Sequence, residues 1–233
     1  MDELNPYIAG RVLVFDKPLG QTSFQLVGRV RWLLCRHLGV KKLKVGHAGT
    51  LDPLATGVML VATGKATKRI EELQRGCKEY VATVQLGATT PSFDLEHPVD
   101  KTYPTSHITQ TLIEETLERF RGDIMQVPPA FSACKVDGKR AYDLARKGKD
   151  VELQAKPITI HSLTLLAFDA ESMSLTLHVE CSKGTYIRSL ARDLGEALHS
   201  GAHLTALRRT RVGDFSEAQC LTLQQFEETL QSQ

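Results

Sequence analysis

Residues 44–57 read KVGHAGTLDPLATG and combine three glycines, two alanines and two threonines with one histidine and one acid, Asp52. Glycine carries no Cβ, so a glycine-rich stretch marks a place where backbone approaches another group closely. An acid in such a loop is most often a turn former or an ion-pair partner. The alternative is a carboxylate that a substrate can reach. The loop residues alone leave both interpretations open.

The composition is that of an ordinary globular protein. The 233 residues are 42% apolar and 24% charged, enough for one large or two small domains. The N-terminus has no apolar signal-peptide core, and no apolar run approaches the roughly 18 residues that span a membrane. The five cysteines are scattered and never form CxxC, which fits a reducing cytosol. We therefore expect a cytoplasmic protein with no membrane segment.

The charges are unevenly distributed, although the net charge is only +2. No acid occurs between Lys17 and Leu51, where about four would be expected from the overall composition. A second basic run, HLTALRRTRVG, lies near the C-terminus. This distribution favours a polyanionic partner, and a solvated surface with uneven charge is the alternative. The residues of the two runs are Lys17, Arg29, Arg31, Arg36, Lys41, Lys42 and Lys44, and then Arg208, Arg209 and Arg211.

Helices and strands are interleaved without a regular βαβ rhythm, which predicts an α+β fold with a mixed or antiparallel central sheet flanked by helices and loops. A helix should begin at a Thr22 or Ser23 cap and end near His37, with Phe24, Val27, Val30, Leu34 and Leu38 on its apolar side. The other predicted helices are 65–74, 108–120, 184–198, one after a turn at 137–138, and a closing helix beyond 211. The predicted strands are 10–18, 58–63, 78–87, 158–170, 172–182 and 203–215, with a long loop at 88–106.

Several cofactor motifs are absent. The stretch GKAT at 64–67 fails as a phosphate-binding loop because six residues separate Gly57 from Gly64, and Ala66 stands where Ser or Thr would bind magnesium. None of the eight histidines has the spacing of a metal ligand. We expect no metal and no nucleotide cofactor.

Four segments together resemble the bacterial tRNA pseudouridine synthase B (TruB-type) family. They are DKP, GHAGTLDPLATG, KEYVATVQLG and CSKGTYIRSLARDLG, in family order and at family spacing between Gly10 and Arg211. The resemblance implies the pseudouridine synthase fold and the isomerisation of uridine 55 in the tRNA T-loop. It also implies that neither a metal nor an organic cofactor takes part.

The resemblance implies a role for particular residues. Asp52 matches the catalytic aspartate, Tyr80 the tyrosine that stacks on the target base, and Arg188 the arginine that pairs with the aspartate. His47, Tyr186 and Leu207 match residues that line the pocket or hold the substrate. Lys17 and Lys68 fall on basic positions with a role in structure or backbone contact. The further basic residues would contact phosphates, and they are Lys41, Lys42, Lys44, Arg208, Arg209 and Arg211.

The expected chemistry explains why one acid suffices. Uracil must leave C1′ through N1, turn, and rejoin through C5. An ionised carboxylate can attack C1′ or stabilise the positive charge that develops there. A glycosidase needs a second carboxyl group to protonate its leaving group, but here the base is retained. The proton displaced from carbon could go to a phenol such as that of Tyr80.

The chain departs from the family at two points. Family members commonly read TDTxDxxG after the tyrosine-bearing strand, whereas this chain reads TTPSFDLEH, with Pro91 and His97 as replacements and Asp94 retained. We also expect a single catalytic domain over residues 1–233, without a C-terminal PUA domain, and a monomer that binds the T-arm of tRNA. The alternatives are an RNA-binding or tRNA-folding module, and the same fold acting on another RNA.

Overall fold

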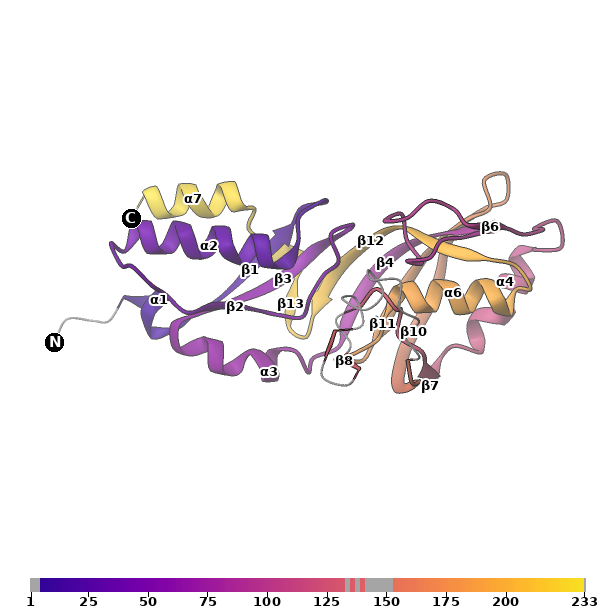
Figure 1. Ribbon diagram of the computed structural model, residues 1–233, viewed down its shortest axis with the longest axis horizontal. Helices are drawn as coiled ribbons and strands as arrows, with labels where there is room; N and C mark the ends of the chain where they lie inside the picture. Colours follow the sequence, from indigo (N-terminus) through magenta and orange to yellow (C-terminus); the bar gives the residue numbers. More distant parts are fainter. Residues whose placement is uncertain (1–4, 133–134, 137–138, 141–152, 233) are drawn as a thin grey trace. The chain divides into compact units, whose positions relative to one another are not determined.

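The computed structural model describes residues 5–132, 135–136, 139–140 and 153–232 (Figure 1). The chain forms two compact units. The first unit contains residues 1–79 and 208–233, and the second contains residues 80–207. The two units are described separately below.

The sheet of the first unit is built on one long central strand. Strand β3 (Ala55–Thr63) pairs antiparallel with β1 (Val12–Lys17) and with β2 (Val45–Ala48). It also neighbours β12 (Ala202–Val212), whose last residues belong to this unit and pair with the short β13 (Phe215–Ser216). Three short helices complete this part: α1 (Pro6–Ala9), the 3₁₀ helix η1 (Gly64–Arg69) and α3 (Ile70–Leu73).

Two helices of the first unit pack against each other, α2 (Ser23–His37) and α7 (Leu223–Gln231), the latter preceded by the 3₁₀ helix η2 (Glu217–Gln219) (Figure 1). Both begin with a capping box, in which the Thr22 and Thr222 hydroxyls accept from the backbone three residues on. The core between helix and sheet includes Phe15 and Phe226, whose rings meet edge-on with centroids 5.2 Å apart. The Thr22 cap and the end of α2 at His37 confirm the predicted limits of this helix.

One residue of that helix was wrongly placed. Phe24 was predicted on the apolar side, but its side chain is 74% exposed. The buried face of α2 instead runs through Leu26, Val30 and Leu34, which follow one another at intervals of four residues. Phe24 lies in the first turn, outside this stripe.

The sheet in the second unit has the strand order β12, β4 (Lys78–Leu86), β11 (Ser174–Cys181), β10 (Lys156–Asp169) and β7 (Gly122–Gln126), and β10 pairs antiparallel with β11 and with β7. Strand β4 shows strict alternation of buried and partly buried residues, as expected for a sheet with one covered face. The unit also contains α4 (Gln110–Glu118) and α6 (Ile187–Ala197). The hairpin of β10 and β11 turns around Glu171, as predicted.

The α+β class with a mixed or antiparallel sheet is confirmed. The predicted loop at 88–106 contains a small two-stranded sheet, β5 (Ala88–Thr89) and β6 (Lys101–Thr102). A second small sheet joins β8 (Lys135–Val136) and β9 (Lys139–Arg140), while the helix predicted after the 137–138 turn lies outside the described residues. Among the described helices, none has the length and hydropathy needed to cross a membrane.

Candidate active site

The loop that carries Asp52 is fixed on both sides of this residue. Before it, the Ser23 hydroxyl and the backbone of Leu51 exchange two hydrogen bonds of 2.9 Å. After it, the Gly20 amide donates to the carbonyl oxygen of Pro53 at 2.8 Å. The Ala55 amide donates to the Asp52 carbonyl oxygen at 3.0 Å, which closes a turn through Pro53. The start of α2 therefore holds the backbone on either side of the carboxylate in place.

Lys17 supports the same loop from inside the first unit. Its side chain has no exposed surface, and its Nζ donates to the carbonyl oxygens of Pro18, Gln21 and Pro53 at 2.9, 2.7 and 3.4 Å. Burial lowers its pKa from 10.5 to about 8, an effect that the attraction of the Asp52 carboxylate partly offsets. Of the two roles that the sequence left open, structure and backbone contact with RNA, the burial of Lys17 favours structure.

Arg209 bridges the two ends of the loop. It is 2% exposed, and its guanidinium donates to the carbonyl oxygens of Gly49 at 3.1 Å and Val58 at 2.8 Å. These two residues flank the segment that contains Asp52. The sequence placed Arg209 among the phosphate contacts, because its neighbours are basic and its burial does not show in the composition. The structure assigns it to the support of the loop, and we leave it out of the proposed RNA contacts.

His47 lies in β2, at the entrance to the loop, and is partly buried. Burial and the nearby positive charge of Arg209 lower its pKa below 6.5, and a backbone contact with Gly49 opposes them. Its Nδ1 atom is buried and makes no hydrogen bond within the described part of the chain. The lowered pKa favours the neutral imidazole, whose Nδ1 keeps an unused capacity for a hydrogen bond.

Arg188 is the buried charge of the second unit. It lies in the first turn of α6, is 4% exposed, and has its Nε 3.7 Å from Oδ2 of Asp94. Its other nitrogens donate to the carbonyl oxygens of Ser92 at 3.1 Å and Phe131 at 2.9 Å. The segment TTPSFDLEH, which departs from the family pattern, thus folds around this guanidinium with its retained Asp94.

The remaining predicted pocket residues also belong to the second unit. Tyr80 lies in β4 and is 8% exposed, and Leu207 lies in β12 and is partly buried. They are the first and last residues of the unit. Tyr186 caps α6, and its backbone exchanges two hydrogen bonds with the side chain of Gln126, at 2.8 and 3.1 Å. In the first unit Lys17 and Arg209 thus support the loop that carries Asp52, and in the second unit Arg188 pairs with Asp94.

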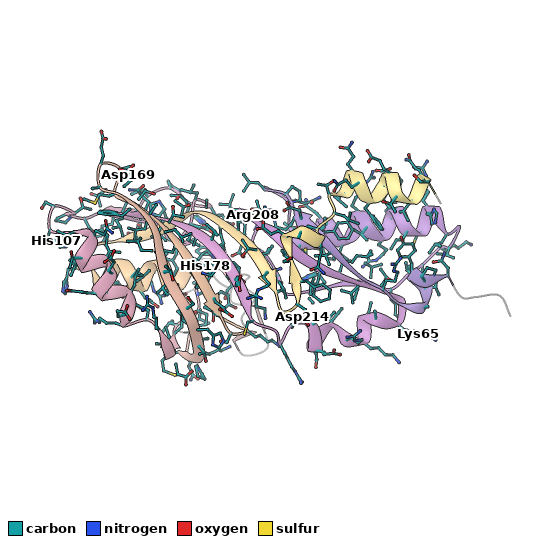
Figure 2. All side chains as sticks on the ribbon, turned by 180° about the vertical axis from the view of Figure 1, so that it is seen from behind. Lys65, His107, Asp169, His178, Arg208 and Asp214 are labelled. Carbon is teal, nitrogen blue, oxygen red and sulfur yellow. The ribbon has the colours of Figure 1, made fainter. Side chains whose placement is uncertain are left out.

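The basic residues predicted to contact phosphates fall into two groups. Arg208 pairs with Asp16 at 2.9 Å and with Glu217, and Arg211 pairs with Glu79 (Figure 2 labels Arg208). Their charges are already compensated within the first unit. The other group consists of exposed lysines that form no ion pair with any described residue: Lys41, Lys42, Lys44 and Lys68.

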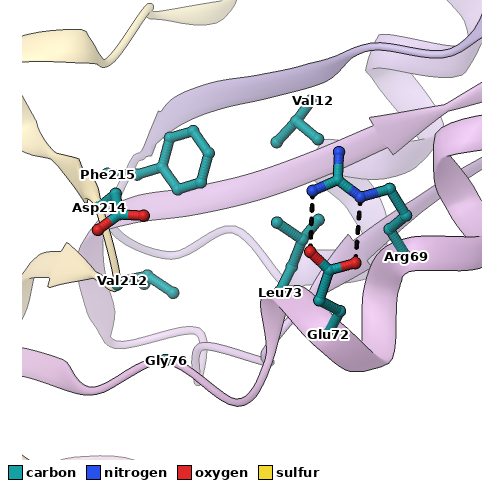
Figure 3. A pocket seen from close by; sticks show the side chains of 9 residues that line it. Val12, Arg69, Glu72, Leu73, Gly76, Val212, Asp214 and Phe215 are labelled. Carbon is teal, nitrogen blue, oxygen red and sulfur yellow. Dashed lines mark hydrogen bonds and ion pairs between the residues drawn. The ribbon is translucent and has the colours of Figure 1, made fainter.

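A separate pocket of about 410 Å³ lies in the first unit, between α3 and the turn that joins β12 to β13 (Figure 3). Val12, Leu73 and Phe215 line it with apolar groups, and the ion pair of Arg69 and Glu72 lies at its edge. None of the residues predicted for catalysis or RNA contact lines this pocket. Within the described residues, no three metal-ligating side chains gather, here or elsewhere.

Comparison with known proteins identifies the family. Residues 36–187 match the model of the TruB family pseudouridylate synthase N-terminal domain, and residues 188–233 that of the tRNA pseudouridylate synthase B C-terminal domain. The tRNA pseudouridine synthase B of Phocaeicola vulgatus is 65% identical over 96% of this chain and 94% of its own length. That of Bacteroides thetaiotaomicron is also 65% identical, with the same coverage.

A solved structure supports the assignment. A crystal structure of a Cbf5–Nop10–Gar1 complex contains a chain that is 30% identical, with a TM-score of 0.71. The match covers 95% of this chain and 54% of that one, so this chain spans about half the length of its structural relative. A pseudouridylate synthase moves uracil from an N1 to a C5 linkage, which is an isomerisation. The chain belongs to the TruB family of pseudouridylate synthases and is an isomerase of RNA uridine.

Proposed function

We propose that the protein isomerises uridine 55 in the T-loop of tRNA to pseudouridine. The observation that carries the proposal is the fixed backbone around Asp52, because a carboxylate that must meet C1′ of a ribose needs a defined position. The relatives that share 65% identity over nearly the whole of both chains are named for tRNA. The relative in the Cbf5–Nop10–Gar1 complex is less than half as similar, at 30% identity. The names of the relatives with 65% identity favour tRNA over another RNA.

The chemistry begins at the carboxylate. Asp52 attacks C1′ or stabilises the positive charge that develops there as uracil leaves through N1. Small residues surround it, since Ala48, Gly49 and Thr50 precede it within four positions. A flipped nucleotide can then bring its sugar close to the acid. Because the uracil rejoins the same ribose, the reaction needs no second carboxylate to release it.

The residues of the second unit would handle the base. Tyr80 provides an aromatic face for the extruded uracil, and its phenol can take the proton displaced from carbon when C5 has bonded to C1′. The family pattern gives Arg188 the role of keeping the catalytic carboxylate ionised. Tyr186 and Leu207 would line the pocket, and His47 would hold the flipped backbone or the space that the base vacates.

The exposed lysines would bind the RNA backbone. Lys41, Lys42 and Lys44 follow α2 closely, and Lys68 lies in η1. Phosphate contacts position an RNA without reading its sequence, and their contribution weakens as salt rises. We also propose that the enzyme is a monomer that binds the T-arm and acts in the cytoplasm. Its reaction would use neither a metal nor an organic cofactor.

Tritium release tests the proposal. A tRNA transcript labelled with [5-³H]uridine should release tritium in the presence of the wild-type chain, because C5 loses its hydrogen when it bonds to C1′. A transcript with cytidine at position 55 should release none. Asp52→Asn should abolish release, whereas Asp214→Asn, an exposed acid at the separate pocket, should release as the wild type does.

Each outcome discriminates between the alternatives. Absence of release from the wild type on tRNA would contradict the enzymatic proposal and favour an RNA-binding module. Release from the position-55 variant transcript would contradict the T-loop assignment. Unchanged release by Asp52→Asn would remove Asp52 from the chemistry.

A further inference from the structure

Helix α2 presents an aromatic side chain to solvent between two arginines. Trp32 is 47% exposed. The guanidinium carbon of Arg29, one turn before it, lies 4.5 Å from the centroid of its ring, and that of Arg36, one turn after it, lies 5.4 Å away. A guanidinium over an aromatic face is attracted to the ring, so the two arginines and Trp32 form one exposed aromatic and cationic cluster.

The two arginines are held differently. Arg29 forms an ion pair with Glu227 of α7 at 3.1 Å, so its place beside the ring is fixed. Among the described residues, the Arg36 guanidinium forms no ion pair and no hydrogen bond. Its one interaction there is with the Trp32 ring. A planar group can therefore displace Arg36 from the ring, and the freed guanidinium can then bind an anion.

The charge around this ring matches an anionic partner. No acid occurs from Lys17 to Leu51, and the chain that leaves α2 brings the exposed Lys41 and Lys42 within five and six residues of Arg36. Six residues of chain span about 20 Å at most, so Lys41 and Lys42 lie within the length of a few nucleotides from Arg36. Glu227 of α7 comes close to this face of the helix, and its charge is compensated by Arg29.

We propose that Trp32 and Arg36 form a stacking site for an unpaired nucleotide of the RNA substrate. The base lies on the Trp32 ring on the side of Arg36, and the adjoining phosphates contact Arg36, Lys41 and Lys42. Aromatic rings beside basic side chains bind single-stranded nucleic acid in this way without reading its sequence. The inference rests on the proposed function for the identity of its ligand, and it adds a contact outside the Asp52 loop.

A protein partner is the other possible occupant. An apolar partner surface would cover Phe24 as well, which is 74% exposed and lies about 12 Å along the helix from Trp32. An RNA base would need only the ring flanked by the arginines. Phe24→Ala is therefore a matched control for Trp32→Ala, because both remove an exposed aromatic side chain from the same helix.

Trp32 is the only tryptophan of the chain, so its fluorescence reports on this site alone. Titration with unmodified tRNA should quench its emission, with the same midpoint as filter binding of that tRNA. Heparin, a polyanion without bases, should leave the emission unchanged. Trp32→Ala should weaken tRNA binding about tenfold, as expected for the loss of one stacked base. Trp32→Phe and Phe24→Ala should each stay within about twofold of the wild type.

Pseudouridine formation is measured in the same samples, which separates the two proposals. If tRNA binds and is modified while the emission stays unchanged, the stacking site is wrong and the proposed function stands. Equal quenching by heparin, or equal losses in Trp32→Ala and Phe24→Ala, would also overturn it. If no tRNA binds, both proposals fail together.

Discussion

Arg188 and Asp94 form an ion pair that is almost completely buried, with Nε and Oδ2 3.7 Å apart and side chains that are 5% and 8% exposed. Asp94 also accepts the Glu96 amide at 3.0 Å, and the Thr90 hydroxyl donates to its carbonyl oxygen at 2.7 Å. Asp94 thus orders the 90–96 segment through its backbone and its carboxylate, and the carboxylate compensates a guanidinium of α6.

Asp94→Asn should therefore destabilise the protein and reduce its activity. The substitution leaves the Arg188 charge buried without its carboxylate, for which a loss of about 3 kcal/mol in the free energy of unfolding is expected. Urea unfolding measures this loss, and tritium release from labelled tRNA measures the activity. The exposed Asp214 provides a control, since Asp214→Asn should change neither quantity. Wild-type stability in Asp94→Asn would show that the ion pair contributes nothing.

Stability should rise with pH in the range where Lys17 loses its proton. Its folded pKa is about 8 and its ordinary value is 10.5, so between these values the unfolded chain binds more protons than the folded one. The free energy of unfolding therefore gains a contribution as pH increases through this window, and loses it as pH falls back through 8.

Lys17→Met isolates this contribution. The variant lacks the titrating group, so the difference in unfolding free energy between the wild type and Lys17→Met should grow from pH 8 to pH 10.5. Urea unfolding of both proteins at several pH values measures the difference. Lys68→Met, at an exposed lysine, controls for the loss of one lysine side chain at the surface. A difference for Lys17→Met that stays constant from pH 8 to pH 10.5 would contradict the lowered pKa of Lys17.

The sequence predicted the helices and strands well wherever periodicity and caps agree. The capping pair of Thr22 and Gln25 and the alternation of residues 78–86 each specify one element, and both are present. The two-residue strands β5 and β6 were missed, because two residues are too few to show a period. Phe24 was misplaced because its spacing to Val27 also fits a helical stripe, whereas the buried stripe runs through Leu26, Val30 and Leu34.

The candidate site was predictable only as a set of residue types. Arg208, Arg209 and Arg211 look alike in the sequence, yet Arg209 is buried beneath the Asp52 loop while the other two pair with acids far away in the chain. Such partners depend on strand order and register, which are tertiary properties. The pairing of Arg188 with Asp94 is of the same kind, since 93 residues separate them in the chain.

Arg209→Lys should impair catalysis and stability without changing the salt dependence of RNA binding. Lysine keeps the charge but cannot reach the carbonyl oxygens of Gly49 and Val58 together, so the loop around Asp52 loses a clamp. We expect at least a tenfold loss of kcat, since a small displacement of a reacting group is costly. Tritium release measures kcat, and filter binding at several salt concentrations measures the salt slope.

A residue that contacts phosphate would behave differently from Arg209 as a support of the loop. Loss of one such contact lowers the salt slope by about one and leaves kcat unchanged. Lys42→Gln, at an exposed position, is the control that should show this pattern. If Arg209→Lys showed it instead, its assignment to the support of the loop would be wrong.

Gly57→Ala should be far more destabilising than Gly20→Ala, although both glycines have positive φ, +101° and +78°. A Cβ at Gly57 would lie 2.2 Å from the carbonyl oxygen of Arg209, so β3 and β12 would have to separate, whereas a Cβ at Gly20 meets nothing within 4 Å. Gly20→Ala should cost about 1 kcal/mol from backbone strain alone, and Gly57→Ala at least ~3 kcal/mol. Urea unfolding compares the two variants with the wild type. Backbone strain is common to both positions. Equal losses of unfolding free energy would therefore mean that the close approach of β3 and β12 adds nothing. The end of the Asp52 loop would then require glycine only for its backbone conformation.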